Sequence, residues 1–157
     1  MTFRGRWLLQ IVLRTADTYD KGDNVSVPDS TDSPPPTRSL SILVVDDDPV
    51  VLKTVELLLS LEGHSARSVP GGCEAIDLLQ QQSYDLVISD VRMPRMDGIQ
   101  LSRKIRTAYP STPIILMTGH IAEYSLGTAS EIGINCILHK PFRADELRDA
   151  VQQAIAS

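Results

Sequence analysis

The chain has 157 residues, of which 42% are hydrophobic and 22% are charged, and its formal net charge at pH 7 is -5. This length fits one domain with a few dozen residues to spare, and the composition allows a packed core, so a wholly disordered chain is excluded. The acidic balance disfavours a nucleic-acid-binding surface, which normally needs a basic face or arm. We therefore expect no direct contact with nucleic acid.

Two cysteines, Cys73 and Cys136, stand in apolar sequence contexts. Their spacing is typical of neither a disulfide framework nor a metal site, which favours a reducing, cytoplasmic setting. We expect both residues to act as small buried fillers of the core.

An apolar run, Trp7–Leu13, stands near the start of the sequence and follows Arg4 and Arg6. Gln10 interrupts the run and Arg14 ends it, so a signal peptide is disfavoured, and the run is far too short to span a bilayer. We expect no membrane partner, although an interfacial or partner-binding amphipathic helix is an alternative for this run.

Residues 15–39 consist mainly of Asp, Ser, Thr, Gly and Pro and include a triple proline at 34–36. A segment of this composition cannot bury enough apolar surface to offset the entropy cost of ordering it. We expect residues 1–38 to form a disordered or weakly structured extension with a proline-stiffened linker, and residues 39–157 to form the folded domain.

After residue 39, short apolar runs rich in β-branched residues alternate with segments of helical periodicity. Helical spacing of apolar residues predicts a helix after each run, including a short one at 121–132. Alternating strands and helices form βαβ units, which predicts an α/β fold with a parallel sheet covered on both faces. Apolar runs predict strands at residues 40–45, 85–89, 113–118 and 135–138, and a more polar run predicts a fifth strand at 64–69.

Two of the predicted strands end in acidic residues. Asp46 and Asp47 follow the first strand, and Asp90 follows the third. Ligand sites of open parallel sheets lie at the carboxyl ends of the strands. Converging carboxylates repel by up to about 4 kcal/mol per pair at about 4 Å when the effective dielectric constant is about 20, so a positive charge must offset them. Either Mg²⁺, which takes one or two protein carboxylates, or a lysine would do so.

The last two strands end in a hydroxyl and an ammonium group, supplied by Thr118 and Lys140. A carboxylate nucleophile can form an aspartyl phosphate, while a metal ion, a hydroxyl and a lysine bind the oxygens of the transferred group. Asp90 stands alone at its strand end and is the natural nucleophile. Asp46 and Asp47 come as a pair, which is better suited to holding a metal ion.

A set of short motifs occurs near these strand ends: Val44-Val-Asp-Asp47, Ser89-Asp-Val-Arg-Met-Pro94, Asp97-Gly98, Met117-Thr-Gly119 and Lys140-Pro-Phe142. Each motif alone is common, but the ordered set makes residues 39–157 resemble the receiver domain of two-component response regulators. The resemblance implies a flavodoxin-like (βα)5 fold, which is a doubly wound parallel sheet with the strand order 2-1-3-4-5. In that order the first and third strands are neighbours, so their terminal carboxylates converge.

The resemblance implies that Asp90 accepts a phosphoryl group from a sensor histidine kinase or a histidine phosphotransfer protein. Thr118 would donate its hydroxyl to one phosphoryl oxygen, and Lys140 would pair with another. The Lys140–Pro141 bond would be cis, which suits a proline that shapes a site.

The resemblance also implies a site for Mg²⁺, with Mn²⁺ as a substitute. Asp47, Asp90 and the backbone carbonyl of Arg92 would bind the ion directly, and Asp46 would act mainly through water. Arg92 and His120 occupy loop positions where the family tunes the access of hydrolytic water. The alternative is that both are ordinary exposed loop residues.

Phosphorylation would then shift a two-state equilibrium at the face formed by the helix at 121–132, the last strand and the last helix. A downstream protein target would read this face, and phosphorylation-dependent homodimerisation is a further expectation. Thr118 and Ile137 are the switch positions. Ile137 stands where many receivers carry a tyrosine or phenylalanine, so the coupling would not use an aromatic side chain there.

Two further acids carry the sequence signature of helix caps. Asp48 precedes Pro49 at a first helical position, and Asp97 precedes Gly98, so we expect each acid to cap the helix that follows it. Asp48 is therefore not assigned as a third metal ligand.

These patterns predict a response regulator with no effector domain, which catalyses only its own phosphorylation and dephosphorylation and is not an enzyme for a separate substrate. A pseudo-receiver, which binds a partner without being phosphorylated, is the alternative. A phosphatase of the haloacid dehalogenase type would need its nucleophile at the first strand in an Asp-x-Asp pattern. A flavodoxin-like flavin binder would need a phosphate loop rich in serine and threonine, where this chain is acidic.

Overall fold

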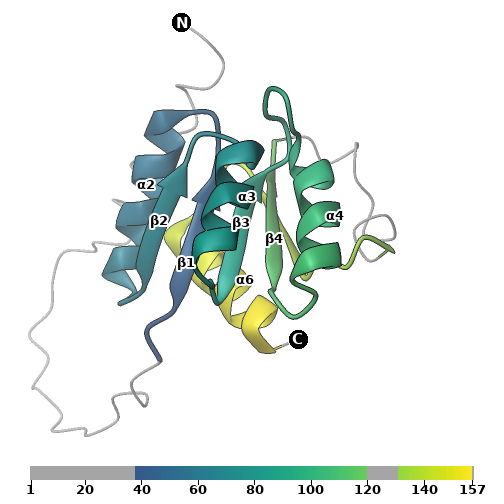
Figure 1. Cartoon of the computed structure of the whole chain (residues 1–157). Coiled ribbons are helices and arrows are strands. Elements are labelled where there is room, and N and C mark those ends of the chain that lie inside the picture. Colours follow the sequence, from purple (N-terminus) through teal and green to yellow (C-terminus); the bar gives the residue numbers. More distant parts are fainter. Residues whose placement is uncertain (1–37, 120–130, 157) are drawn as a thin grey trace, which may run out of the picture.

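The computed structural model of the chain describes residues 38–119 and 131–156 (Figure 1). The predictions for residues 1–37, for His120 and for most of the helix at 121–132 lie outside the described residues. None of the described helices combines the length and the apolar character that are needed to cross a membrane.

Five parallel strands form the sheet at the centre of the fold (Figure 1). Their order is β2-β1-β3-β4-β5, as the sequence resemblance implies. The bounds of each strand differ from the predicted ones by one residue at most. The strands are β1 Ser41–Val45, β2 Ser65–Val69, β3 Leu86–Asp90, β4 Ile114–Thr118 and β5 Cys136–His139.

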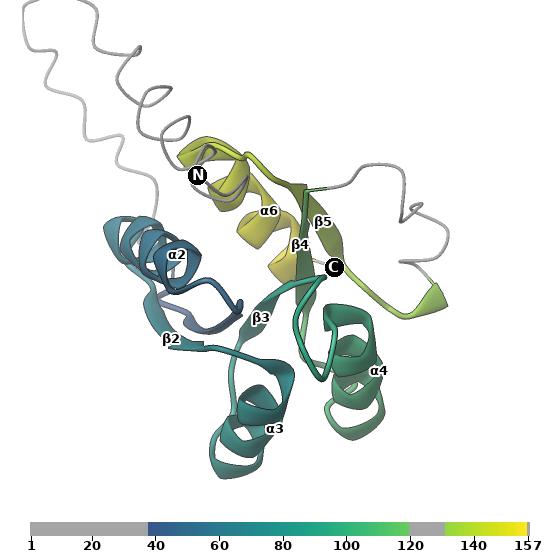
Figure 2. The same cartoon turned by 90° about the horizontal axis from the view of Figure 1, so that it is seen from above.

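Helices cover both faces of this sheet. In Figure 2, α2 and α6 lie on one side of the sheet, and α3 and α4 lie on the other. Two clusters of buried side chains match these layers, one beneath α2 and α6 and one beneath α3 and α4. This arrangement confirms the predicted doubly wound α/β fold. The described helices are α2 Pro49–Leu61, α3 Gly72–Gln81, α4 Gly98–Ala108 and α6 Ala144–Ala156.

The strands differ in burial according to their place in the sheet. All residues of β3 and β4 are buried, as expected of inner parallel strands with helices on both faces. β2 lies at an edge, and exposed and half-buried residues alternate along it until the buried Val69. The buried centre of the sheet therefore ends in two polar residues, Asp90 and Thr118.

Both predicted acidic caps are confirmed. At the start of α2, the Asp48 side chain accepts the N–H of Val50 at 2.9 Å, and Pro49 occupies the first helical position. At the start of α4, the Asp97 side chain accepts the N–H of Gln100 at 2.7 Å, and the Gln100 side-chain oxygen accepts the N–H of Asp97. These bonds satisfy backbone donors that a helix start leaves unpaired.

The prediction of a buried core filler is wrong for Cys73 and is met in part for Cys136, which packs against the core beneath α2 and α6. Cys73 is exposed and Cys136 is half-buried. α3 buries Gly72, Ala75 and Leu79 against the core, and helical spacing puts Cys73 outside this buried set. Cys136 belongs to β5 at an edge of the sheet, and its partial burial raises the pKa of its thiol.

Candidate functional site

The strand register brings polar residues together at the carboxyl edge of the sheet. The last residue of β1 pairs with Ser89 of β3, so the residues that follow, Asp46 and Asp90, occupy neighbouring positions. Asp90 pairs in turn with Met117 of β4, which places Thr118 one step further along that strand. Three residues that are far apart in the sequence therefore meet at one edge.

Lys140 joins this edge from the end of β5. Its backbone N–H donates to the carbonyl of Thr118 at 2.7 Å, and its Nζ contacts Asp46 Oδ2 at 2.7 Å and Asp90 Oδ1 at 2.6 Å. The side chains of Lys140, Asp46 and Asp90 are 12%, 2% and 11% exposed, so the ammonium bridges two nearly buried carboxylates. The Lys140–Pro141 bond is cis, as predicted.

Backbone N–H groups hold the other two carboxylate oxygens. Asp46 Oδ1 accepts the N–H of Asp48 at 2.9 Å, and Asp90 Oδ2 accepts the N–H of Arg92 at 2.8 Å. Each of the four oxygens therefore has a donor, and both carboxylates are fixed in orientation. We call Asp46, Asp90 and Lys140 the carboxylate cluster.

The charge of the carboxylate cluster is negative when both acids are ionised. Burial raises the pKa of the Asp46 carboxyl; the nearby Lys140 lowers it, and the charge of Asp90 raises it further. In the described part of the chain, both carboxylates share the ammonium of Lys140. One negative charge thus stays in excess in a poorly solvated place, where it is costly.

The oxygen donors of this edge suit a small, hard cation that would offset this excess. Mg²⁺ keeps several waters and usually takes only one or two carboxylates from a protein. Within residues 38–119 and 131–156, no three acidic, histidine or cysteine side chains form a metal-binding group. A pair of carboxylates completed by water fits this geometry better than a cage of protein ligands. Asp47, a predicted ligand, directly follows Asp46 and is half-buried.

Gly98 packs against the backbone that carries Asp90. A Cβ atom at position 98 would lie 2.2 Å from the Asp90 carbonyl oxygen, and the Gly98 N–H donates to the carbonyl of Val91 at 2.8 Å. A side chain at this position would therefore displace the end of β3. The sequence singled out the Asp97-Gly98 pair as the start of a helix, and its contact with β3 becomes visible only in the folded chain.

The remaining predicted site residues surround the carboxylate cluster. Arg92 is exposed in the loop after β3 and gives its backbone N–H to Asp90. Ile137 is half-buried in β5, where it pairs with Leu116 and packs against the core beneath α3 and α4. His120 lies outside the described residues.

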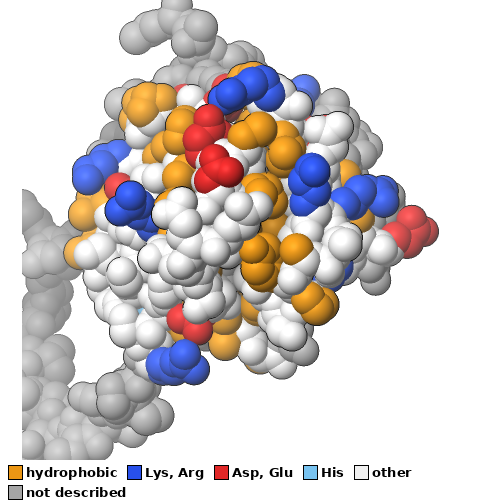
Figure 3. All heavy atoms as spheres, viewed as in Figure 1, with side chains coloured by type: hydrophobic (Ala, Val, Ile, Leu, Met, Phe, Trp, Pro, Cys, Tyr) orange, Lys and Arg blue, Asp and Glu red, His pale blue; other side chains and the backbone are white. Residues whose placement is uncertain are grey.

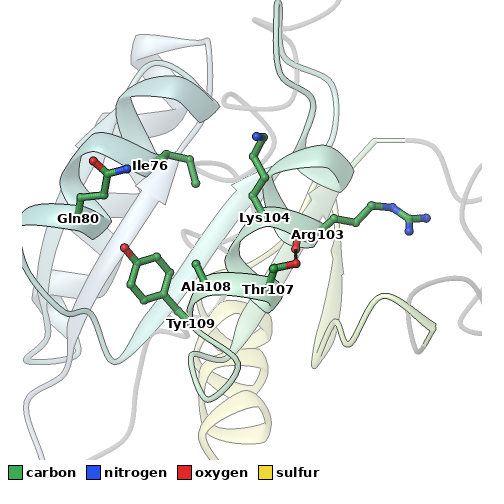
Figure 4. Close-up of a pocket in the computed structure, with 7 residues that line it drawn as sticks. All are labelled: Ile76, Gln80, Arg103, Lys104, Thr107, Ala108 and Tyr109. Carbon is green, nitrogen blue, oxygen red and sulfur yellow. Dashed lines mark hydrogen bonds between the residues drawn. The ribbon is translucent and has the colours of Figure 1, made fainter.

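A separate groove of about 390 Å³ lies between α3 and α4 (Figure 4). In Figure 3, a band of hydrophobic atoms runs between these helices, with lysine and arginine side chains beside it. The carboxylate cluster does not line this groove, so the two features are distinct. The lining residues are Ile76, Gln80, Arg103, Lys104, Thr107, Ala108 and Tyr109.

The family model of the response regulator receiver domain matches residues 42–152. Among curated proteins, the transcriptional regulatory protein GlrR of Escherichia coli (strain K12) is 39% identical over 114 residues, which cover 73% of this chain and 26% of that regulator. This chain thus spans about a quarter of the length of that relative. The matched region includes every residue of the carboxylate cluster.

Solved structures agree with the family match. A response regulator receiver domain protein from Clostridium thermocellum has a TM-score of 0.69 and 30% identity, covering 74% of this chain and 94% of that one. The receiver domain of the sensor histidine kinase PA1611 from Pseudomonas aeruginosa PAO1 has a TM-score of 0.68 and 31% identity, covering 76% of this chain and 99% of that one. That structure has a magnesium ion coordinated in its active-site cleft.

Proposed function

The chain belongs to the receiver domain family of two-component response regulators, and we propose that Asp90 is its phosphoacceptor. The observation that carries this proposal is the carboxylate cluster. One oxygen of Asp90 is held by a backbone N–H and the other by Lys140. An oriented carboxylate beside an ammonium group supports attack on phosphorus, because the ammonium can bind the oxygens of the transferred group.

The phosphoryl group comes from a phosphohistidine on a sensor histidine kinase or a histidine phosphotransfer protein. An oxygen of Asp90 attacks phosphorus, the P–N bond breaks, and its electron pair stays on the imidazole of the donor. Lys140 then transfers its ammonium contact to a phosphoryl oxygen, and Thr118 donates its hydroxyl to another. The placement of Thr118 and Lys140 on adjacent strand ends supports these two roles.

Mg²⁺ is the cofactor of this reaction, and Mn²⁺ can replace it. Asp47, Asp90 and the backbone carbonyl of Arg92 would hold the ion, and Asp46 would act mainly through water. The bound ion supplies neutralisation of the charge on the transferred group. The excess negative charge of the carboxylate cluster supports this assignment, as does the magnesium ion in the related PA1611 receiver domain.

Phosphorylation is the signal, and the module does not act on a separate substrate. Thr118 and Ile137 change their packing, and the altered face of β5, α6 and residues 121–132 binds a downstream protein or a second copy of the chain. Arg92 and His120 tune the access of hydrolytic water to the phosphoryl group. Residues 39–157 form this cytoplasmic signalling unit, and residues 1–38 precede it as an extension.

Labelling with a small phosphodonor tests the proposal. The purified chain mixed with acetyl phosphate and Mg²⁺ should gain the mass of one phosphoryl group. Asp90→Asn should remove this gain, and a chelator should prevent it in the native chain. Asp85→Asn alters an acid at the opposite end of β3 and should keep the gain, which makes it the matched control. A folded native chain that stays unmodified would instead identify a pseudo-receiver.

A further inference from the structure

α2 carries an exposed apolar stripe along its length. Val50, Leu57 and Leu61 are 52%, 58% and 75% exposed, and their spacing puts them on one face of the helix together with Thr54. The Thr54 hydroxyl donates to the carbonyl of Val50 at 2.8 Å, so its donor is satisfied within the helix. We call these four residues the α2 stripe.

The α2 stripe is larger than an isolated exposed side chain. It extends for about 16 Å at the usual rise of a helix. In the described part of the chain, the only other strongly exposed large hydrophobic residue is Ile155 of α6, at 42%. Single exposed apolar residues are ordinary on protein surfaces, whereas a contiguous apolar patch marks a contact site.

The chain itself contains an occupant for this surface. The segment Trp7–Leu13 has six large apolar residues in seven positions, and the 24 residues at 14–37 that join it to the domain are mostly polar. We propose that the α2 stripe is the docking surface for the chain's own segment Trp7–Leu13. Burial of the two apolar surfaces against each other removes both from water.

The chain that joins Leu13 to the domain is long enough for this docking. It enters the domain near Leu61, at the C-terminal end of α2. The Leu40 N–H donates to His64 Nδ1 at 3.4 Å, and His64 lies three residues after Leu61. A polar chain of 24 residues spans roughly 27 Å, which exceeds the length of the α2 stripe. Tethering also gives the segment an effective concentration on the order of millimolar, so a weak apolar contact suffices.

Charge favours the α2 stripe over the groove between α3 and α4. Arginines flank the segment Trp7–Leu13 on both sides. Arg103 and Lys104 line the groove (Figure 4) and would repel these arginines. By contrast, α2 and its two capping residues carry three acids and one base, which are Asp48, Glu56, Glu62 and Lys53.

A docked segment would also border the carboxylate cluster, because Val50 lies four residues after Asp46. A protein that brings a phosphohistidine to Asp90 must cover this edge of the sheet. The segment therefore competes with a protein donor, while a small donor such as acetyl phosphate is unhindered. This consequence rests on the proposed function, whereas the docking itself does not.

Fluorescence of the full chain tests the docking, because Trp7 is its only tryptophan. The unmodified chain should show a blue-shifted tryptophan emission and weak quenching by acrylamide. The double substitution Leu57→Ser and Leu61→Ser should shift the emission to that of a solvated indole and increase the quenching. Ile155→Ser, an exposed apolar residue on another helix, is the matched control and should change neither. Circular dichroism checks that each variant is folded.

Three results would overturn the docking. The first is the emission of a solvated indole in the unmodified chain. The second is a blue shift that survives the double substitution, which would place Trp7 elsewhere, such as in the groove between α3 and α4. The third is a blue shift that disappears on dilution, which would identify a second copy as the partner. Labelling with acetyl phosphate in the same samples separates the two proposals, because an unlabelled chain with a buried Trp7 contradicts the proposed function alone.

Discussion

The two ends of the parallel sheet use similar polar side chains for different purposes. At the amino end, the Asp85 carboxylate accepts the N–H of Ser41 at 2.8 Å and the guanidinium of Arg38 at 3.1 Å. The Asn135 side chain accepts the N–H of Ile114 at 2.9 Å. These acceptors satisfy backbone donors that the strand starts would otherwise leave unpaired.

Arg106 adds to the amino end from the last turn of α4. Its guanidinium donates to Asn135 Oδ1 at 3.2 Å and to the carbonyl of Thr112 at 3.1 Å, and it also contacts the carbonyls of Pro110 and Gly133. The segments that lead into β4 and β5 are thereby tied to one helix. The side-chain and carbonyl acceptors at this end each meet a donor, although the buried Arg106 Nε has no hydrogen-bond partner among the described residues.

At the carboxyl end, the carboxylate cluster holds two acids and one base. Asp46 and Asp90 share the ammonium of Lys140, and ionisation of both acids leaves an excess negative charge. We infer that the amino end stabilises the sheet, whereas the carboxyl end retains unfavourable charge that a bound cation would offset. Substitutions at the two ends should therefore respond differently to Mg²⁺.

Lys140→Met, at the carboxyl end of the sheet, should lower the free energy of unfolding more than any other substitution considered below. The substitution keeps an apolar stem but leaves two nearly buried carboxylates without their shared ammonium. Removal of one partner from a buried ion pair is strongly destabilising, so we expect a loss of about 3 kcal/mol in the free energy of unfolding in metal-free buffer. Urea denaturation with and without Mg²⁺ measures this loss. Mg²⁺ should restore more stability to this variant than it adds to the native chain, and an equal or smaller gain would contradict the comparison.

Gly98→Ala should cost about 2 kcal/mol through overpacking, because its Cβ would lie 2.2 Å from the Asp90 carbonyl oxygen. This loss comes from steric contact rather than from charge, so Mg²⁺ should not reverse it. Gly119→Ala is the control, since among the described residues no atom beyond its chain neighbours lies within 4 Å of the Cβ position there. If the two variants have equal unfolding midpoints in urea, the close approach of Gly98 to β3 is not a constraint.

Asn135→Ala tests the amino end. It leaves the N–H of Ile114 without its acceptor and removes one contact of Arg106. An unsatisfied buried donor costs about 1–3 kcal/mol, and we expect a loss of about 2 kcal/mol by urea denaturation. The variant should still be labelled by acetyl phosphate, and Mg²⁺ should give it no more stability than it gives the native chain. Loss of labelling in the folded variant would show that the two ends are not independent.

Asp46→Asn should have the smallest effect on the free energy of unfolding, and it should raise this free energy where the other substitutions lower it. Burial raises the pKa of Asp46 above its usual value of 3.8, so the folded state keeps a proton that the unfolded state has already lost. The stability from this group is present below that usual value and is lost as the pH rises through the raised pKa. In metal-free buffer at pH 7, Asp46→Asn should therefore be more stable than the native chain, and its advantage should shrink on acidification. A variant that is less stable at pH 7 would contradict this account.

The sequence predicts the fold well because burial shows directly in the residue pattern. β3 and β4 begin as apolar runs and are buried throughout, and their bounds are predicted within one residue. The strand order, by contrast, follows from the family resemblance and not from the pattern. An apolar sequence context is not enough to predict the burial of Cys73. Its exposure depends on which face of α3 packs against the sheet, and Cys73 lies outside that face.

The candidate site is predicted only in part. The sequence locates Asp46, Asp90 and Lys140 at strand ends, and the structure brings these three together, but their roles in phosphoryl chemistry stay predictions. The sequence does not show that Lys140 bridges both acids, because these contacts span 94 and 50 positions in the chain. The approach of Gly98 to Asp90 also depends on how α4 meets the sheet.

Locating the phosphoryl group on the chain shows directly whether Asp90 is the phosphoacceptor. Borohydride reduces an aspartyl phosphate to homoserine, so reduction of the chain after treatment with acetyl phosphate and Mg²⁺ marks the acceptor for peptide mass mapping. We expect homoserine at position 90 alone. Homoserine at position 46 or 47, or none in a chain verified as folded, would contradict this expectation.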